Sequence, residues 1–348
     1  MTQERIGWID TAKGAAILLI VLWHAYLTSR MLGSFPQGLA AASQWLSSVR
    51  LPVFFLASGM LMQRLASRSY GQLARRRVLP MMWLLIVWTA IGSALGAIVK
   101  LYPWQEGPGH LPGPAEVLWS PQGNLWFIYA VIVFAVMGKV VADRKGWSRA
   151  ATVGALFAVL VAYDAWRGQL VTRNLVQFFP FYMLGLLGHG AIVRLTGNGT
   201  RVAALGAACA AGLVALDATG LAGLAQKAAS NVLGLGLGVA VAAGLQWLPR
   251  VAQGFDAVGR RSLAIFLGHQ PLLALGWAFA PGLVLLPPVA AWIALSAFAI
   301  GGALLLERTA RQAGLGWLYR APPSLVDQAV DWARALRPAR RHAPALTP

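Results

Sequence analysis

Cysteines and acidic residues are scarce in this sequence, and each shortage excludes a class of chemistry. Cys209 is the only cysteine among 348 residues, so the chain can form neither an intrachain disulfide nor a thiolate metal site. Eleven residues are Asp or Glu, against 29 Lys and Arg, and every acid falls in a loop or at the end of an apolar stretch. We therefore expect neither carboxylate-pair catalysis nor a carboxylate proton relay inside a membrane, and we predict no metal cofactor.

Charge of either sign is also rare, at 11% of residues, whereas 58% are hydrophobic and the mean hydropathy is +0.62. These values exclude a soluble globular protein, and apolar stretches in lipid must be helical because lipid cannot satisfy a bare backbone. We predict an all-α polytopic integral membrane protein with about ten transmembrane helices. The predicted spans are residues 12–28, 45–65, 79–99, 124–142, 150–166, 176–193, 201–218, 229–247, 262–281 and 284–306.

Basic residues are distributed unevenly between the predicted loops. If the N-terminus is cytoplasmic, 23 of the 29 Lys and Arg residues lie on the cytoplasmic side. The six on the outer side are Arg30, Arg50, Lys100, Arg167, Arg173 and Lys227. This is the positive-inside distribution, so we predict that both termini are cytoplasmic. It explains the net charge of +18 without nucleic acid, and part of that charge is expected to bind anionic membrane lipids.

Two histidines, His24 and His269, are the only ionisable residues near the middle of predicted spans. An ionisable side chain at that depth is costly unless it has a partner, which favours a functional role. The alternative is a neutral ring hydrogen-bonded between helices. Lys13 precedes His24 by eleven residues, which is nearly three helical turns and roughly 16 Å. Both side chains therefore lie on one face of the first predicted helix.

Several polar residues flank the spans without a clear chemical role of their own. Ser58 and Gly59 lie near mid-depth in the second span, where small residues let another helix or a ligand approach closely. Asp10 is three residues from Lys13 and forms a plausible helix-end ion pair. The basic run at 75–77 is explained, taken alone, as a determinant of topology.

The outer connection at residues 100–123 is too long for a plain hairpin, and it contains Glu116. Loops of this size often lie over a site. Trp126 follows it, at a depth where aromatic residues usually anchor a span at the interface. In the ninth span, Pro271 frees a backbone carbonyl beside His269, and kinks of this kind often border a cavity.

No internal repeat or second soluble domain is apparent. We assign residues 1–310 to a transmembrane domain and residues 311–348 to a basic cytoplasmic tail. Ser324 is expected to cap a short amphipathic helix that lies on the membrane, with Asp327 in its first turn and Arg337 to Pro348 as a flexible end. The alternating glycines at 234, 236 and 238 predict close helix packing, because no strand precedes them as a nucleotide-binding loop requires.

Taken together, these stretches resemble the acyltransferase-3 family of bacterial inner-membrane O-acyltransferases. The matching stretches occur in the expected order: Trp8-Ile9-Asp10-Thr11-Ala12-Lys13-Gly14 with His24, then Phe54-Phe55-Leu56-Ala57-Ser58-Gly59, then Leu125-Trp126-Phe127, then Ile265-Phe266-Leu267-Gly268-His269-Gln270-Pro271. The resemblance implies transfer of an acyl group, usually acetyl from cytoplasmic acetyl-CoA, to a hydroxyl of an envelope or exported carbohydrate or glycolipid.

The resemblance also implies roles for particular residues. The family's histidine maps onto His24, its basic partner onto Lys13, and its third-span arginines onto Arg75, Arg76 and Arg77. Two departures from the family pattern are present. Lys13 replaces the commoner arginine and cannot grip a phosphate through two parallel hydrogen bonds. Ala74 stands where the first arginine of a pair is expected, which leaves Arg77 as the better match.

We therefore predict His24 as general base, with Ser58 and His269 as further catalytic candidates. Lys13 and the arginines at 75–77 are predicted to hold the CoA phosphates. Asp10, Trp126 and Glu116 are predicted to contact substrate. A covalent acyl intermediate on His24 or Ser58 is less favoured, because the sequence shows no base beside Ser58.

Two other functions are compatible with the sequence. A transporter or flippase for a polar or lipid-linked solute would use the polar centre around His24 and His269 as its binding site. The pattern from Lys13 to His24, with no acid inside the spans, favours the enzyme over transport. A member of this family that has lost catalysis is the third possibility, and the altered arginine motif is its support.

Overall fold

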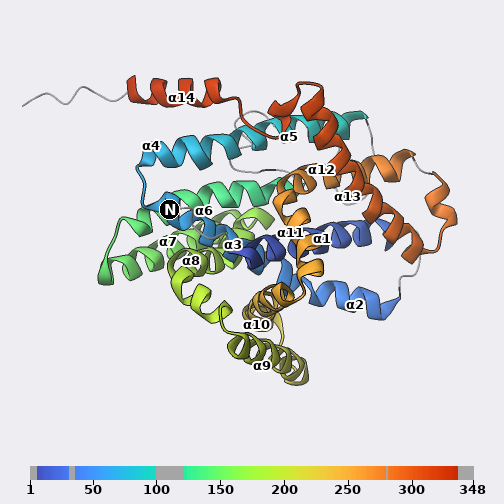
Figure 1. Cartoon of the computed structure of the whole chain (residues 1–348), viewed down its shortest axis with the longest axis horizontal. Helices are drawn as coiled ribbons and strands as arrows, with labels where there is room; N and C mark the ends of the chain where they lie inside the picture. The colour runs from blue at the N-terminus through green and yellow to red at the C-terminus, as the bar shows by residue number, and fades with distance from the viewer. Residues whose placement is uncertain (1–5, 31–35, 99–120, 122, 280, 336–348) are drawn as a thin grey trace, which may run out of the picture.

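The computed structural model describes residues 6–30, 36–98, 121, 123–279 and 281–335, and every regular element in these ranges is helical (Figure 1). The α-helices are α1 (Gly7–Ser29), α2 (Gln37–Trp45), α3 (Ser47–Ala66), α4 (Tyr70–Leu73), α5 (Leu79–Ile98), α6 (Trp126–Ala142), α7 (Gly146–Arg167), α8 (Leu170–Thr196), α9 (Gly199–Ala218), α10 (Gly223–Gly244), α11 (Pro249–Arg260), α12 (Ser262–Phe279), α13 (Pro288–Gln312) and α14 (Pro323–Ala335). A π-helix, η2 (Ala74–Val78), joins α4 to α5, and short 3₁₀ helices form η4 (Gly123–Leu125), η5 (Leu245–Trp247), η6 (Pro281–Leu285) and η7 (Gly316–Leu318).

Ten helical segments in the described part of the chain are long and apolar enough to cross a membrane. Four of them combine consecutive elements: α2 continues into α3, α4 continues through η2 into α5, η4 continues into α6, and α10 continues into η5. All ten coincide with the predicted spans. The prediction of an all-α polytopic membrane protein is therefore confirmed.

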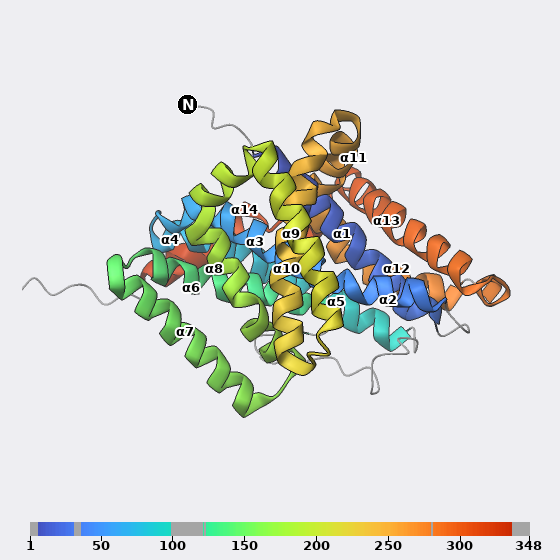
Figure 2. The same ribbon diagram turned by 90° about the horizontal axis from the view of Figure 1, so that it is seen from below.

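The helix α1 lies inside the bundle, in contact with α3, α10, α11, α12 and α13 (Figure 2). Its first turns face α11, where Gly14 and Gly259 each bring the two backbones together. A Cβ atom on Gly14 would collide with the carbonyl oxygen of Phe255, and one on Gly259 would collide with that of Asp10. Since no side chain separates the two helices, α1 has little freedom to slide or tilt.

A second close backbone contact joins α3 to α8. A Cβ atom on Gly59 would meet the carbonyl oxygen of Tyr182, and one on Gly185 would meet that of Leu56. The small residue at 59 thus serves the approach of a helix, one of the two uses that the sequence allowed. Gly234 makes a similar contact with the backbone of Ser48, so the prediction of close packing around the alternating glycines is also confirmed.

Two helices occur where the sequence analysis expected loops. The outer connection predicted at 30–44 contains α2 from Gln37, because Pro36 fixes the backbone just before an alanine-rich segment with high helix propensity. The segment between the eighth and ninth spans forms α11, which begins with Pro249 at its first position and is strongly amphipathic. A search for long apolar runs misses both helices.

The expected tail helix is present as α14, but it begins at Pro323, so Ser324 lies in its first turn and does not cap it. The helix runs alongside α4 and the start of α5 (Figure 1). Two of its carboxylates, Asp327 and Asp331, bind the guanidinium of Arg75 at 3.1 and 3.3 Å. The tail is thus attached to the predicted donor-binding arginines, a contact that the sequence did not predict.

Candidate active site

The two predicted intramembrane histidines meet between α1 and α12. The distance from His269 Nε2 to His24 Nδ1 is 3.1 Å, and the ring centroids are 5.1 Å apart with a tilt of 34°. His269 is fully buried and His24 is half-buried. The structure therefore joins two residues that are 245 positions apart in the chain.

The backbone of α12 fixes which ring nitrogen of His269 carries hydrogen. His269 Nδ1 lies 2.7 Å from the carbonyl oxygen of Phe266 and 3.1 Å from that of Ile265. Carbonyl oxygens only accept hydrogen bonds, so Nδ1 is the protonated nitrogen and Nε2 of the neutral ring is an acceptor. His24 Nδ1 must then donate to His269 Nε2, which leaves the lone pair of His24 on Nε2. Two neutral rings in this order form a directed hydrogen-bond chain.

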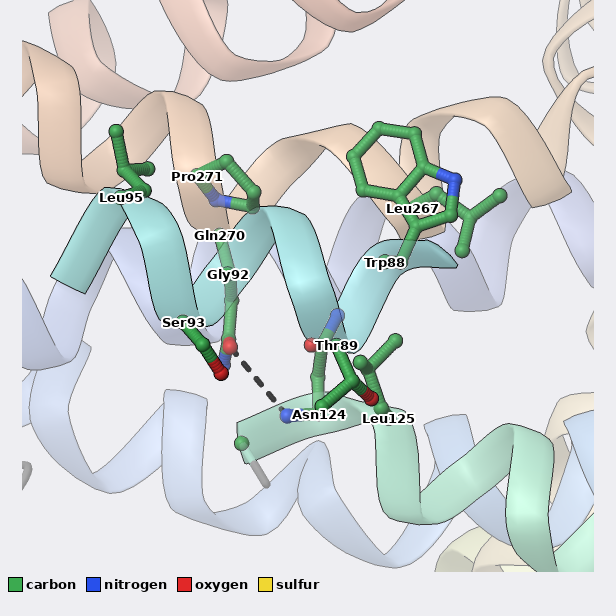
Figure 3. A pocket seen from close by; sticks show the side chains of 11 residues that line it. Trp88, Thr89, Gly92, Ser93, Leu95, Asn124, Leu125, Leu267, Gln270 and Pro271 are labelled. Carbon is green, nitrogen blue, oxygen red and sulfur yellow. Dashed lines mark hydrogen bonds between the residues drawn. The ribbon is translucent and has the colours of Figure 1, made fainter. Parts of the chain in front are cut away.

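Asn124 supports this chain from the start of the fourth span. Its side-chain Nδ2 donates to the Phe266 carbonyl oxygen at 3.0 Å, and its backbone N–H donates to Gln270 Oε1 at 3.3 Å (Figure 3). The same carbonyl that orients His269 is therefore held by Asn124. The sequence analysis assigned no role to Asn124 or Gln270, although Asn124 adjoins one quoted motif and Gln270 lies within another. The available signal was a carboxamide next to an apolar span.

A small cavity of about 50 Å³ lies beside this turn of α12. Its lining includes Thr89 and Ser93 of α5, Asn124, Gln270 and Pro271 (Figure 3). The Ser93 hydroxyl is buried and has no hydrogen-bond partner among the described residues. The cavity is large enough for ordered water. Pro271 thus lines a cavity, as the sequence led us to expect.

Arg50 is the second residue near His24 that the sequence analysis did not select. It is 6% exposed, its guanidinium lies 4.6 Å from the centre of the Trp23 ring, and it donates to the Ser43 carbonyl oxygen at 3.3 Å. Its charge is close enough to act on His24 electrostatically. From the sequence, Arg50 was counted among the basic residues on the outer side, and that count gave no sign of its burial near His24.

Among the other residues predicted to be catalytic or to contact substrate, Ser58 and Trp126 make their described contacts away from the two histidines. Ser58 is buried on α3 and makes no hydrogen bond to either histidine within the described ranges. Trp126 is part of an aromatic cluster, with its ring 5.9 Å from Phe178 and 6.1 Å from Phe55. Glu116 lies outside the described residues. The roles predicted for these three remain predictions.

At the opposite end of α1, Lys13 and Asp10 form the expected ion pair, with 3.3 Å between Nζ and Oδ1. Beside them, the Thr11 hydroxyl donates to Asp256 of α11 at 2.5 Å and accepts from Gln246 Nε2 at 2.6 Å. The uninterrupted helix from Gly7 to Ser29 carries both Lys13 and His24, as the sequence predicted. Lys13 thus has a carboxylate neighbour in the absence of any ligand.

The three consecutive arginines do not form a single cluster in the structure. They lie in η2, and π-helical turns of this kind often occur at functional sites. Arg75 is paired with α14, Arg76 is exposed, and Arg77 is half-buried. The Nε atom of Arg77 and the hydroxyl of Tyr182 are both buried without a hydrogen-bond partner in the described part of the chain. The Nε atom of Arg75 is likewise buried without a partner there, but its terminal nitrogens bind α14, so Arg77 is the half-buried arginine that is not paired with the tail.

Comparison with known proteins places the chain in a family. The family model Acyl_transf_3, described as an acyltransferase domain, matches residues 6–308. The chain is similar to the inner membrane protein YcfT of Escherichia coli (strain K12), with 28% identity over 212 residues that cover 53% of this chain and 56% of the relative. It thus spans about half the length of that curated relative. No solved structure matches. Because the family model covers most of the sequence, from the start of α1 to the last part of α13, the chain belongs to the acyltransferase-3 family.

Proposed function

We propose that this protein is an O-acyltransferase of the bacterial inner membrane that moves an acetyl group from acetyl-CoA to a hydroxyl of an envelope or exported carbohydrate. Membership of a membrane acyltransferase family supports the reaction class. The similarity to an inner membrane protein supports the location. The observation that carries the proposal is the hydrogen-bonded pair of His24 and His269, because it leaves one ring nitrogen of His24 as a free base.

In this mechanism, His24 Nε2 takes the proton of the acceptor hydroxyl as its oxygen attacks the thioester carbonyl carbon. The new C–O bond forms, the C–S bond breaks, and His24 returns the proton to the departing thiolate, so that free CoA thiol and an ester are produced. An imidazole suits this task because its ordinary pKa is near neutral, so it can both take up and return a proton. His269 positions the His24 ring and fixes its tautomer, as the third member of a catalytic triad does.

Arg50 supplies positive charge beside the same ring. Attack on the thioester places negative charge on the carbonyl oxygen, and a fixed cation in a site of low dielectric stabilises such a charge strongly. The buried position of Arg50, held by Trp23 and the Ser43 carbonyl, means that its guanidinium needs no reorganisation during the reaction. We assign Arg50 to this electrostatic role.

We place the CoA phosphates at the Lys13 end of α1, which the distribution of basic residues assigns to the cytoplasm. Lys13 and Arg77 provide positive charge there. The Trp8 indole and the Tyr182 hydroxyl are further buried donors without partners among the described residues. The roughly 16 Å between Lys13 and His24 along α1 is of the right order for the pantetheine arm. When the donor binds, its phosphates would compete with the Asp10 carboxylate for the ammonium of Lys13.

The test uses purified protein in liposomes with acetyl-CoA and envelope carbohydrates. Free CoA thiol and the acetyl mass increment on the acceptor are measured for the wild type, His24→Ala and Lys13→Ala. His189→Ala is the matched control, since His189 lies on α8 outside the proposed site and is only half-buried. We expect His24→Ala to abolish transfer, Lys13→Ala to weaken acetyl-CoA binding, and the control to behave as wild type.

Two outcomes would overturn the proposal. Full transfer by His24→Ala would remove the general base. Solute uptake into the liposomes without acetyl-CoA consumption would favour the transporter function instead.

A further inference from the structure

A second and larger cavity lies at the end of the bundle where α3, α8 and α10 begin and α9 ends. Its volume is about 460 Å³, within the range of about 300–1,000 Å³ for ligand sites. By the proposed topology this end faces away from the cytoplasm. Four carboxamide side chains line it, and we call it the amide cavity: Asn174 and Gln177 from α8, and Gln226 and Asn231 from α10.

The carboxamides of the amide cavity are available for a ligand. None of the four makes a side-chain hydrogen bond to another residue in the described part of the chain. Asn231 is only 4% exposed, and its amide has no protein partner but still opens onto the cavity. Such an amide must be satisfied by water or by a ligand in the cavity.

The remaining lining selects the ligand class. Ser47 and Ser230 add hydroxyls that both donate and accept, and the Ser48 hydroxyl, which donates to the Trp45 carbonyl at 2.8 Å, adds an acceptor. Trp45, which is 37% exposed, offers an aromatic face. One carboxylate, Asp217, offsets the one ammonium, Lys227, so the cavity has no net charge to attract a phosphate. Amides, hydroxyls and one aromatic face match the hydroxyls and the apolar face of a neutral sugar.

A layer of aromatic rings separates the amide cavity from the histidines. Phe178 lines the cavity and stacks on Phe55 at 5.1 Å, and Phe55 packs against Phe127 at 4.8 Å. Phe127 in turn lies 5.3 Å from Phe266, the residue whose carbonyl orients His269. A sugar in the cavity is therefore not the sugar whose hydroxyl reaches His24.

From this arrangement we propose that the amide cavity binds a neutral sugar unit of a carbohydrate acceptor at a distance from the unit that is acylated. This inference rests on the proposed function for the identity of the acceptor. It deepens that function by naming the acceptor as a chain of at least two sugar units, held on the side of α3 that faces α8 and α10. The cavity sets affinity for the acceptor and takes no part in the chemistry at His24.

The experiment measures binding and turnover separately. Protein in lipid nanodiscs is titrated with oligosaccharides released from the envelope of the producing organism and with defined gluco-, galacto- and N-acetylglucosamine hexasaccharides. The variant is the double substitution Asn174→Leu with Gln177→Leu. Gln37→Leu is the matched control, because Gln37 is an exposed amide at the start of α2 outside the cavity. Thermal unfolding confirms that each variant is folded.

We expect the double variant to weaken oligosaccharide binding by about ten-fold or more, as the loss of several hydrogen bonds predicts. Its KM for the oligosaccharide should rise in proportion, with kcat and the KM for acetyl-CoA unchanged. His24→Ala should bind the oligosaccharide as the wild type does. Sugar binding by a wild type that transfers no acetyl group would refute the proposed function and leave the cavity assignment standing. Wild-type affinity in a folded double variant, or no oligosaccharide binding by the wild type, would overturn the assignment.

Discussion

Replacing His269 tests whether it acts through His24 or only fills space. In His269→Leu, the 3.1 Å hydrogen bond to His24 Nδ1 is lost, and only the Ile20 backbone remains to orient the His24 ring. One neutral hydrogen bond is worth about 1 kcal/mol, or roughly five-fold in rate. In a Ser-His-Asp triad, removing the charge of the Asp lowers kcat by about 10⁴-fold. Hydrogen bonds to charged partners are about twice as strong as those between neutral groups. Between these limits we expect kcat to fall by about 100-fold.

The assay follows release of free CoA thiol by the reconstituted enzyme at saturating acceptor. His269→Gln provides the rescue, since its amide oxygen can still accept from His24 Nδ1, and we expect it to stay within about ten-fold of wild type. The KM for acetyl-CoA should be unchanged in both variants. A purely structural role would instead lower the unfolding temperature and affect both variants alike. Wild-type kcat in His269→Leu would refute the assigned positioning role.

Three further results are expected. Replacing Asp327 and Asp331 together by Asn should free the Arg75 guanidinium, which they neutralise, and tighten acetyl-CoA binding by up to about five-fold, the range of an exposed ion pair. Titration with acetyl-CoA measures this change in affinity. Gly185→Ala should destabilise the protein by about 1–3 kcal/mol through collision with α3, whereas Gly154→Ala, with open space around it, should not lower the unfolding temperature. Lys139 and Tyr70 hold the pKa of Asp143 below its usual value, so the stability that Asp143 contributes is present above about pH 4 and is lost on acidification. The difference in unfolding temperature between wild type and Asp143→Asn should therefore vanish at low pH. A difference that does not depend on pH would contradict this.

The transmembrane architecture could be predicted from the sequence because a span is a local property. Twenty apolar residues identify it whatever its neighbours are. The two central histidines could be selected for a similar reason, since an ionisable ring at mid-span is costly wherever it occurs. Their contact required the packing of α1 against α12, which no periodicity encodes.

The residues that were missed owe their importance to tertiary placement. Asn124 looks like the polar end of a span until its amide is seen on the Phe266 carbonyl. Arg50 looks like one of several outer charges until it is found buried over Trp23. Arg75 fits a phosphate site in sequence, yet carboxylates from a helix about 250 residues further along the chain occupy it. Each of these contacts is set by the approach of distant helices.

The order of the site residues along the chain has a consequence for biosynthesis. His24 is in the first of the ten described spans, and its partner follows 245 residues later. At about 5–20 residues per second, translation needs about 12–50 s to supply His269. The Trp292 indole, which donates to the Leu22 carbonyl at 2.7 Å, arrives later still. During that interval the His24 ring lacks the His269 partner that completes the hydrogen-bond chain, so a truncated or half-inserted chain has only the α1 backbone to orient the ring. The pair of histidines forms only when nine of the ten spans are in place, so under the proposed function activity would depend on nearly complete membrane insertion.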